Sequence, residues 1–530
     1  MTKLQDALAT LDQFMATRDS QSAITFHRGV EREALRVSRK DGRISQAAHP
    51  KALGSALTHP SITTDYSEAL MEFITGVHSS VEGVIDELSE IHAYTNRVLD
   101  DMDECLWPGS MPCALESNAE VPIAYFGESN SGKLKRVYRE GLSNRYGRIM
   151  QCIAGMHYNF SFSDDFWVFL ADFHKVDIST SAALQAFKSE QYFALIRNFR
   201  RKSWILSLLF GASPAIDTSF LPAKPDKLSE LGERTWAGQN ATSLRMSNIG
   251  YQNKAQDGLF VCYNDVSTYI DTIKGALRTP YPAYQNLGVK VDDTYKQLSH
   301  NILQIENEYY SDIRPKRVTQ SGEHPSAALQ QRGVEYIEVR IMDLDPSSPI
   351  GMNPETLYFL DTFLMCCMLH GDEKLGMEEC QHLRKAQQEI ATHGRELDAE
   401  FEFGFGPVAL REKANEVLAH MQEIANFLTK QTGNQAYVES VAMQQAKLTQ
   451  PDTLPAAKLI EQCKTQGSYQ EAMLEAGKQQ QQGWLAQPLS DALIAKFEDW
   501  ATTSIEEQAQ IEASDEVDFD TFLEQYMRPQ

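Results

Sequence analysis

The chain has 530 residues with a formal net charge of −24, and 42% of its residues are apolar. That apolar content is typical of a globular protein with a large buried core. Nucleic-acid binding and docking on anionic membranes both require clustered basic side chains, so the surplus of acids argues against partners of either class. Because no apolar run approaches the ~20 residues that a membrane-spanning helix needs, the sequence predicts a soluble protein.

The cysteines and the N-terminus indicate the compartment. The eight cysteines include no CxxC pair, which excludes the zinc-ribbon and thioredoxin patterns. The first residues, MTKLQDALATLDQF, read as an amphipathic helix that contains acids, whereas a signal peptide needs an uninterrupted apolar stretch after a basic start. We therefore expect a cytoplasmic protein with reduced, buried thiols.

Residues 1–354 and 355–530 differ in texture, and we expect a catalytic region followed by a helical region packed on it. The first region mixes helices, such as Ser80–Asp100 and Ser181–Phe210, with short apolar strands. Its predicted strands are Gly29–Val37, Ala69–Thr75, Gly155–Phe162, Leu259–Asn264 and Val334–Met342.

The second region has helical periodicity, and its predicted helices are Glu355–Leu369, Gly376–Glu400 and Pro407–Thr432. Two polar segments follow, a Gln run at Gln479–Gln482 and an acidic end at Glu506–Glu524. Such segments usually lie in solvent, and we interpret both as a solvated helix or a loose tail.

The segment Gly127–Lys133, GESNSGK, fits most of a phosphate-binding P-loop. The pattern then requires Ser or Thr to hold magnesium, and Leu134 stands at that position. We interpret the segment as a polar, Gly-rich loop near a substrate rather than as a P-loop.

Residues Gly29–Val37 alternate with a period of two. On a strand, Glu31 and Glu33 therefore point to one face while Arg32 and Arg36 point to the other. Two neighbouring carboxylates repel, and in a partly buried site a cation between them makes them stable together. An exposed edge strand with solvated charges is the alternative, and this run alone does not decide between them.

Two further predicted strands place polar groups among apolar ones. Glu72 stands inside an apolar strand, and because charged groups are rarely buried without a partner, we favour a functional role for it. Upstream, Asp65 and Glu68 also fit a capping pattern at a turn. His157 and Asn159 lie on the polar face of an aromatic strand, where they line a ligand cleft or face solvent.

The strand Val334–Met342 puts Tyr336, Glu338 and Arg340 on one face. This arrangement suits a metal-binding carboxylate beside a guanidinium that clamps a transferring phosphoryl group, and a simple salt bridge is the alternative.

Arg314, Lys316 and Arg317 form a compact basic cluster in this acidic chain. Such a cluster indicates local binding of an anion, for which a nucleotide's phosphates are a fitting candidate, or else plain surface charge. Together with acids on several strands, one histidine and one arginine, it suggests ATP chemistry on a sheet, with magnesium bridging carboxylates and phosphates.

Longer blocks of sequence carry a specific resemblance. They are GVEREALRV, LGSALTHPSITTDYSEALMEFIT, LWPGSMPC, YREGLSNRYG, GMHYNFSF, LFGASPAI, ATSLRMSNIGY, IENEYYSDIRPKR and GVEYIEVR, in this order from about residue 25 to residue 350. At these blocks the chain resembles bacterial glutamate–cysteine ligases of the gamma-proteobacterial type. The helical C-terminal part resembles the family only loosely.

The resemblance implies an α+β, glutamine-synthetase-like ligase fold, in which a curved, mainly antiparallel sheet lines the cleft and helices lie outside. It implies the reaction of ATP, L-glutamate and L-cysteine to γ-glutamylcysteine, ADP and phosphate, the first step of glutathione biosynthesis. It also implies Mg²⁺, with Mn²⁺ as an alternative, feedback inhibition by glutathione, and a monomer in the cytoplasm.

The resemblance further implies roles for individual residues. The metal-site residues are Glu31, Glu33, Asp65, Glu72, His157 and Glu338. The catalytic pair is Glu338 and the phosphoryl clamp Arg340. The contacts to the cysteine acceptor are Tyr138, Leu142, Arg245, Tyr251 and Tyr310. The contacts to glutamate are Arg139, Gln151 and Asn307. To these we add our own assignment of the basic cluster, Arg314, Lys316 and Arg317, to the nucleotide phosphates.

Two other functions stay open at this stage. One is a γ-glutamyl ligase that uses another amine, or a related phosphotransferase. The other is a catalytically inactive regulator that binds metal or nucleotide. An inactive regulator would be expected to lack some of the acids or the arginine, and all of them are present.

Overall fold

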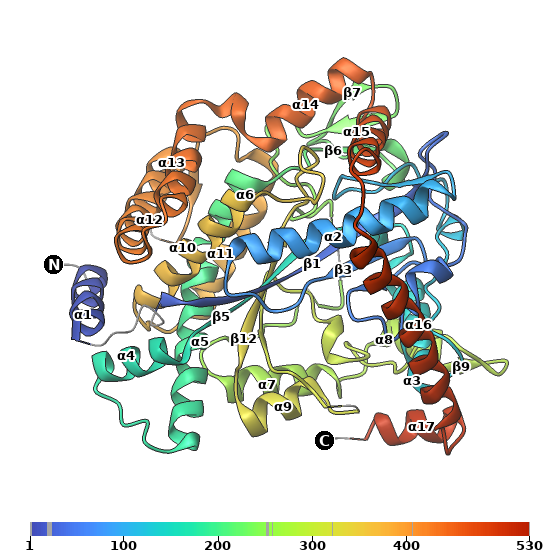
Figure 1. Cartoon of the computed structure of the whole chain (residues 1–530), viewed down its shortest axis with the longest axis horizontal. Coiled ribbons are helices and arrows are strands. Elements are labelled where there is room, and N and C mark those ends of the chain that lie inside the picture. Colours follow the sequence, from blue (N-terminus) through green and yellow to red (C-terminus); the bar gives the residue numbers. More distant parts are fainter. Residues whose placement is uncertain are drawn as a thin grey trace.

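The structure is a computed structural model that describes residues 3–17, 24–250, 254–256, 258–320, 322–404 and 406–528. A seven-stranded sheet crosses the middle of the molecule and helices surround it (Figure 1). Its strands are β1 (Phe26–Ser38), β2 (Ile62–Thr64), β3 (Leu70–Ile74), β4 (Glu104–Leu106), β5 (Met156–Phe162), β11 (Ile313–Lys316) and β12 (Tyr336–Met342). The predicted α+β fold with a mainly antiparallel sheet is confirmed.

The order of the strands is β11-β12-β5-β1-β3-β2, with β4 paired to β1, and every neighbouring pair is antiparallel. Strand β1 is therefore central, with β5 on one side and β3 on the other. The interpretation of Gly29–Val37 as an exposed edge strand is wrong, and its carboxylates lie in the middle of the sheet.

One face of the sheet is apolar and covered by helices. Helix α2 (Val81–Asp100) packs on β1 and β3, α5 (Ser181–Lys202) on β11, and α6 (Trp204–Phe210) on β12. Because side chains alternate along a strand, covering this face leaves the other face to the polar residues. The buried side chains between sheet and helices include Val30, Tyr158, Ile313, Ile337 and Val339.

The predicted helices are confirmed, with changes at their ends. Helix α2 begins after Ser80, whose hydroxyl accepts a hydrogen bond from the Gly83 amide at 3.1 Å. The helix predicted over 181–210 breaks at Ser203 into α5 and α6. In the C-terminal region, α10 (Pro354–Leu369), α11 (Met377–His393) and α12 (Leu410–Thr432) follow, and a short hairpin of β13 (Glu400–Glu402) and β14 (Pro407–Ala409) separates the last two.

The strand predicted at Leu259–Asn264 is wrong, because this segment has no strand partner among the described residues. Its backbone carbonyls bind a side chain instead. Arg197 of α5 donates to the carbonyl oxygens of Tyr263 and Asn264 at 3.3 and 3.1 Å. An apolar run can thus be buried as an irregular segment when an arginine satisfies its backbone.

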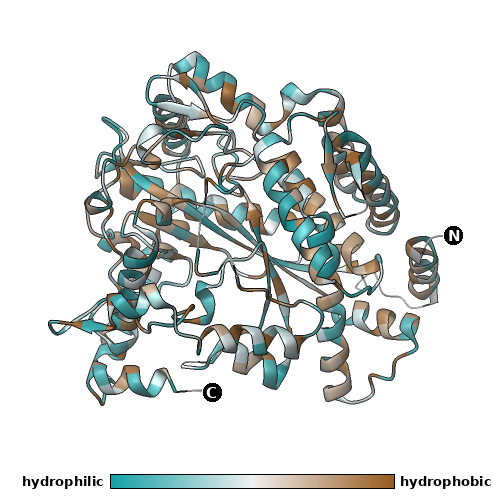
Figure 2. Cartoon of the chain, turned by 180° about the vertical axis from the view of Figure 1, so that it is seen from behind, coloured by the Kyte–Doolittle hydropathy of each residue, from teal (hydrophilic) through white to brown (hydrophobic). Residues whose placement is uncertain are grey.

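The remaining elements lie around this sheet. The helices are α1 (Lys3–Thr17), α3 (Asn130–Tyr146), α4 (Asp164–His174), α7 (Val266–Ala276), α8 (Pro282–Leu287), α9 (Pro325–Arg332), α13 (Ala436–Thr449), α14 (Pro455–Gln466), α15 (Tyr469–Leu485), α16 (Asp491–Ala513) and α17 (Phe519–Tyr526). The short strands are β6 (Ala215–Asp217), β7 (Ser229–Gly232), β8 (Thr235–Ala237), β9 (Lys290–Val291) and β10 (Thr294–Tyr295). Along the peripheral helices, hydrophilic and hydrophobic residues alternate, as expected of helices with one buried side (Figure 2).

The Gln run and the acidic end are helical, in α15 and in α16–α17, but the interpretation that they only face solvent is wrong. Gln481 is 2% exposed, and its side-chain amide donates to the carbonyl oxygens of Asn96 and Glu104. The acidic end packs on other elements, as described below. Every helix in the described ranges is too short or too polar to span a lipid bilayer.

One continuous hydrophobic core contains side chains from both sides of residue 354, such as Leu35 and Phe363. The division of the chain at residue 354 therefore stays a prediction from composition. Across that boundary, a buried ion pair ties β1 to α10. The Arg28 guanidinium contacts the Asp361 carboxylate at 2.6 Å, and Tyr158 donates to the same carboxylate at 2.6 Å.

Replacing Asp361 with Ala should destabilise the fold by about 3–5 kcal/mol, because it leaves the Arg28 charge buried without a partner. The free energy of unfolding from denaturant titration measures this loss. Asp271→Ala on the exposed face of α7 is the control and should change it little. Equal stability of the two variants would contradict a structural role for the pair.

Candidate active site

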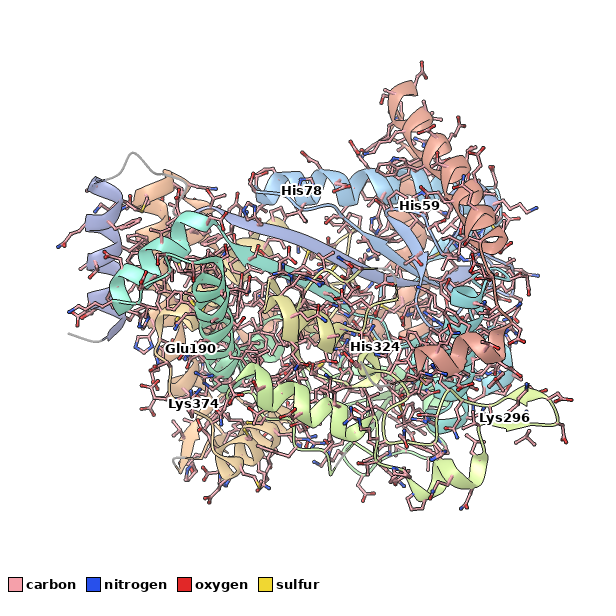
Figure 3. The ribbon with its side chains drawn as sticks, turned by 90° about the horizontal axis from the view of Figure 1, so that it is seen from below. His59, His78, Glu190, Lys296, His324 and Lys374 are labelled. Carbon is pink, nitrogen blue, oxygen red and sulfur yellow. The ribbon has the colours of Figure 1, made fainter. Side chains whose placement is uncertain are left out.

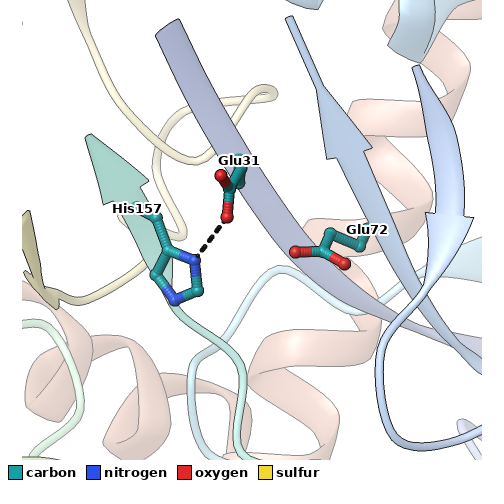
Figure 4. Close-up of side chains that lie close together, drawn as sticks. All are labelled: Glu31, Glu72 and His157. Carbon is teal, nitrogen blue, oxygen red and sulfur yellow. Dashed lines mark hydrogen bonds and ion pairs between the residues drawn. The ribbon is translucent and has the colours of Figure 1, made fainter. Parts of the chain in front are cut away.

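Three side chains from adjacent strands converge on the polar face of the sheet. One ligand atom each of Glu31 on β1, Glu72 on β3 and His157 on β5 lie within 4.8 Å of one another (Figure 4). The antiparallel register produces this proximity, because His157 pairs directly with Glu31 across β1 and β5. In the same way Glu33 pairs with Glu72 across β1 and β3.

Both oxygens of Glu31 accept hydrogen bonds from β5. His157 Nδ1 lies 2.9 Å from Glu31 Oε2, and the Asn159 amide donates to Glu31 Oε1 at 2.9 Å. Burial opposes ionisation of Glu31 and is the largest single effect. The hydrogen bond from His157 and the electrostatic effects of His157 and Lys316 together outweigh it and hold the pKa of this carboxyl below its ordinary value.

Glu33 and Asp65 extend the cluster. Glu33 Oε2 accepts the Gly155 amide at 2.6 Å, and its other oxygen lies 3.6 Å from His157 Nε2. Asp65 follows β2 in a bend rather than at the start of a helix, so the capping interpretation is wrong. The Asp65 charge acts on both Glu33 and Glu72 and raises their pKa values, in addition to the larger effect of burial.

Glu72 is the carboxyl that this environment destabilises most as an anion. Burial raises its pKa well above the ordinary value, and the neighbouring charges of Glu31, Asp65 and Glu33 raise it further. A cation among these groups would reverse that effect, because it favours the ionised form of each carboxyl.

Beside this cluster, Glu338 on β12 forms ion pairs with two basic side chains. Its oxygens lie 3.1 Å from Lys316 Nζ and 3.1 Å from a terminal nitrogen of Arg340. Burial opposes ionisation of Glu338, yet Lys316 and Arg340 outweigh it and hold its pKa well below the ordinary range. The same nitrogen of Arg340 lies 3.4 Å from His157 Nδ1, which connects the two groups.

The residues fit a hard divalent cation. The sheet presents oxygen donors from several carboxylates, one imidazole, and more negative than positive charge around Glu72. Carboxylate oxygens are the protein ligands that Mg²⁺ prefers, and an imidazole in the set also suits Mn²⁺. The residues that could hold such ions are Glu31, Glu33, Asp65, Glu72, His157 and Glu338.

A cavity of about 320 Å³ lies next to Glu338. It contains the predicted basic cluster, Arg314, Lys316 and Arg317, together with Asn307. The basic side chains differ in their partners. Arg314 donates to the carbonyl oxygens of Asn307 and Tyr309, whereas Arg317 pairs with Glu335 at 3.4 Å. Lining residues that the sequence did not single out are Tyr269, Glu306, Thr319 and Ser326.

Among the predicted contacts to glutamate and to the acceptor, Arg139 reaches Asp65 of the acid cluster. Arg139 on α3 donates to the Asp65 carbonyl at 2.5 Å and stacks on the Phe126 ring with 4.4 Å between guanidinium and ring centre. Tyr138 and Leu142 are on the same helix, and Gln151 is buried in the short helix Met150–Cys152.

Arg245 and Tyr310 both contact Met246. Arg245 donates to the carbonyl oxygens of Arg340 and Ile341 at 2.8 and 3.1 Å, and the Met246 sulfur lies 3.4 Å from both Arg245 and Tyr310. Tyr251, the remaining predicted acceptor contact, lies outside the described residues.

The Gly-rich segment 127–133 forms the start of α3, and the interpretation that it lies near a substrate is not supported by its contacts. Ser129 caps the helix through the Gly132 amide. The backbone amides of Glu128 and Asn130 donate to carboxylates of the C-terminal region, Glu512 and Asp515, at 2.8 and 2.6 Å.

Comparison with known proteins gives the family. The profile of the glutamate-cysteine ligase family matches residues 11–390. A protein named glutamate–cysteine ligase from Hahella chejuensis is 44% identical over 528 residues, which covers 99% of each chain. The enzyme of the same name from Pseudomonas paraeruginosa is 44% identical, with coverage of 94% of this chain and 93% of its own.

Solved structures agree with the sequence relatives. The glutamate–cysteine ligase of Francisella tularensis, solved in complex with AMP, superposes with a TM-score of 0.89 at 35% identity, covering 95% of this chain and 98% of that one. A bifunctional glutathione synthetase from Pasteurella multocida shares the fold, with a TM-score of 0.71 at 23% identity over 92% of this chain and 58% of that one. The chain therefore belongs to the glutamate–cysteine ligase family.

Proposed function

We propose that the chain joins the γ-carboxylate of L-glutamate to the amine of L-cysteine at the expense of ATP, giving γ-glutamylcysteine, ADP and phosphate. This is the first step of glutathione biosynthesis. The observation that carries the proposal is the convergence of carboxylates from neighbouring strands beside Arg340 and a basic cavity. Such a site suits phosphoryl transfer between two anionic substrates.

The chemistry requires an activated carboxylate, because oxide is too poor a leaving group for direct amide formation. The glutamate γ-carboxylate attacks the γ-phosphorus of ATP and ADP leaves, which gives γ-glutamyl phosphate. The cysteine amine then attacks the acyl carbon and phosphate leaves. We assign Arg340 to bind the oxygens of the transferring phosphoryl group. One terminal nitrogen of its guanidinium contacts Glu338, and its buried Nε–H has no hydrogen-bond partner among the described residues, which supports this role.

We assign the divalent ions, Mg²⁺ or alternatively Mn²⁺, to the residues Glu31, Glu33, Asp65, Glu72, His157 and Glu338. When bound, such ions screen the repulsion between carboxylate and phosphate. The protein's part is to hold these side chains on rigid, paired strands. The Asn159 amide and the Gly155 backbone orient Glu31 and Glu33 for this purpose.

We assign the cavity beside Glu338 to the nucleotide, with Arg314, Lys316 and Arg317 as candidates for the phosphate contacts. Lys316 supports this assignment, because its ammonium bridges the cavity and Glu338. The glutamate contacts are Arg139, Gln151 and Asn307, and Asn307 also lines the cavity. The acceptor contacts are Tyr138, Leu142, Arg245, Tyr251 and Tyr310.

The thiols of the chain support a mechanism without an enzyme nucleophile. All eight cysteines are free, and all except Cys262 are buried. Burial raises the pKa of Cys105 to about 11 and that of Cys113 to about 12, which leaves both protonated at neutral pH. From the family we further propose a cytoplasmic monomer that glutathione inhibits.

Release of ADP tests the reaction. We expect fast ADP release with glutamate and cysteine together, slower release with 2-aminobutyrate in place of cysteine, and little with glutamate alone. Fast release with an unrelated amine would favour a different γ-glutamyl ligase. Nucleotide binding without ADP release under any condition would favour the inactive regulator.

Glu338→Gln or Glu72→Gln should lower turnover by at least about a hundredfold at saturating magnesium, because each removes a charge from the reacting centre. Initial rates of ADP release measure this effect. Glu230→Gln is the matched control, since that carboxylate is 76% exposed and lies on the small sheet of β7. Turnover of a cluster variant close to that of the control would contradict the assignment.

Arg340→Lys should also lower turnover strongly, since an ammonium cannot make the bidentate contact of a guanidinium with a phosphoryl group. The ratio of kcat between variant and wild type measures this loss. Arg411→Lys, which changes another arginine that pairs with a carboxylate at 2.7 Å, should leave kcat unchanged. A clamp role is wrong if the Arg340 variant keeps full turnover.

A further inference from the structure

We propose that the C-terminal helices α16 and α17 form a positioning strap that sets the geometry of the substrate sites, with Glu512 and Asp515 holding helix α3 and Tyr526 holding the wall of the cavity through His324. The substrates named below rest on the proposed function. Residues 491–526, the strap, contact three segments that border the site.

The first contact fixes α16 on the segment before β2. The Ser504 hydroxyl accepts the Ser55 amide at 3.0 Å, and the Thr58 hydroxyl donates to the Ser504 carbonyl at 2.5 Å. Gly54 has a φ of +76°, and a Cβ there would approach the Cα of Ala501 to 2.8 Å. Only glycine allows this close packing of α16 on the segment. The same segment continues into β2 and Asp65.

The second contact fixes the start of α3. Glu512 and Asp515 accept the amides of Glu128 and Asn130 at 2.8 and 2.6 Å, and the Asn130 side chain donates to the Val517 carbonyl at 2.9 Å. Carboxylates at a helix N-terminus satisfy its unpaired amides and interact favourably with the helix dipole. The strap is thereby attached to the N-terminal end of α3. From this end the helix runs toward the predicted substrate contacts.

Helix α3 transmits this attachment to the acid cluster. The Arg139 guanidinium donates to the Asp65 carbonyl and also to the carbonyl of Lys135, four residues earlier in the helix. A displacement of the helix start would therefore move Arg139 relative to Asp65. Small displacements of substrate-positioning groups are costly for the reaction.

The third contact is at the cavity. The ring of His324 stacks on the Tyr526 ring with 4.8 Å between centres, and His324 Nε2 lies 3.0 Å from the Tyr526 carbonyl. Figure 3 labels His324. On its other side, His324 Nδ1 lies 3.7 Å from Glu306, which lines the cavity and accepts hydrogen bonds from Ser326. Between the two ends, Asp520 binds Lys290 and Tyr295 at 2.7 Å each.

Loss of the contacts at the two ends of the strap should therefore affect the binding of different substrates. Asp515 and Asp520 are exposed, so their contacts add little to global stability. Their loss should act on the position of α3 at one end and on the wall of the cavity at the other. If the strap had only a structural role, loss of these contacts would instead change the melting temperature and leave every substrate affinity unchanged.

The first test uses the full chain with Glu512→Gln and Asp515→Asn combined. Glu507→Gln with Glu516→Gln is the control, because it removes the same charge from exposed neighbours on the strap. We expect KM for glutamate to rise at least about threefold in the first variant, with KM for ATP unchanged, because Arg139 is displaced. Hydrogen exchange of the amides at 127–134 should also become faster than in the control.

The second test uses His324→Phe, which keeps the stacking on Tyr526 but loses both polar contacts. We expect the affinity for ADP with magnesium, measured by calorimetry, to fall at least about threefold, while KM for glutamate stays unchanged. His324→Gln, whose amide can still donate to the Tyr526 carbonyl, should recover part of the affinity.

The outcomes separate the strap from the proposed reaction. Unchanged substrate constants in both variants, or equal changes for glutamate and nucleotide, would overturn the positioning role. Because hydrogen exchange and calorimetry need no turnover, they test the strap even if the wild-type chain fails to ligate glutamate and cysteine. That failure would overturn the proposed function alone.

Discussion

Repulsion among buried carboxylates is the constraint on which the site depends. The antiparallel register sets Glu33 against Glu72 and Glu31 against His157, so several acids share one small region of the sheet. Burial and mutual repulsion raise the pKa of Glu72 well above its ordinary value, which means that this arrangement disfavours its own ionised form. Such a site is unfavourable for folding by itself, and a cation bound there would compensate for it, because it would favour the ionised carboxyls.

The opposite face of the same strands supplies the rigidity that holds the acids together. Strand β1 carries Arg28 and Arg36 on that face, and each pairs with a buried carboxylate, Asp361 and Glu104. Among the described carboxylates none pairs with Arg32, which contacts His92 of α2, and burial lowers its pKa to about 9. The strand thus has acids toward the site and arginines toward the helices, and a shift of register by one residue would exchange them.

Sequence reasoning reached the local part of this arrangement. The period-two alternation of 29–37 and 334–342 correctly placed Glu31 with Glu33, and Glu338 with Arg340, because that period is a property of any strand. It could not give the strand order, which depends on contacts between residues far apart, so the choice between an edge and a central strand stayed open. The predictions for Leu259–Asn264 and Gln481 were wrong, because hydrogen bonds with residues far away in the sequence determine the structure at both places. The assignment of individual substrates came from the resemblance to a family.

The segment Gly127–Lys133 resembles a P-loop in sequence, but its helix N-terminus has different partners. A P-loop uses the amides at a helix N-terminus to bind phosphate, and a magnesium ligand must follow its lysine. Here Leu134 replaces that ligand, and the amides of Glu128 and Asn130 are already occupied by Glu512 and Asp515. The anion at this helix is therefore part of the chain itself. The nucleotide therefore needs another site, and we have proposed the cavity around Arg314 and Lys316, whose basic side chains lie next to Glu338.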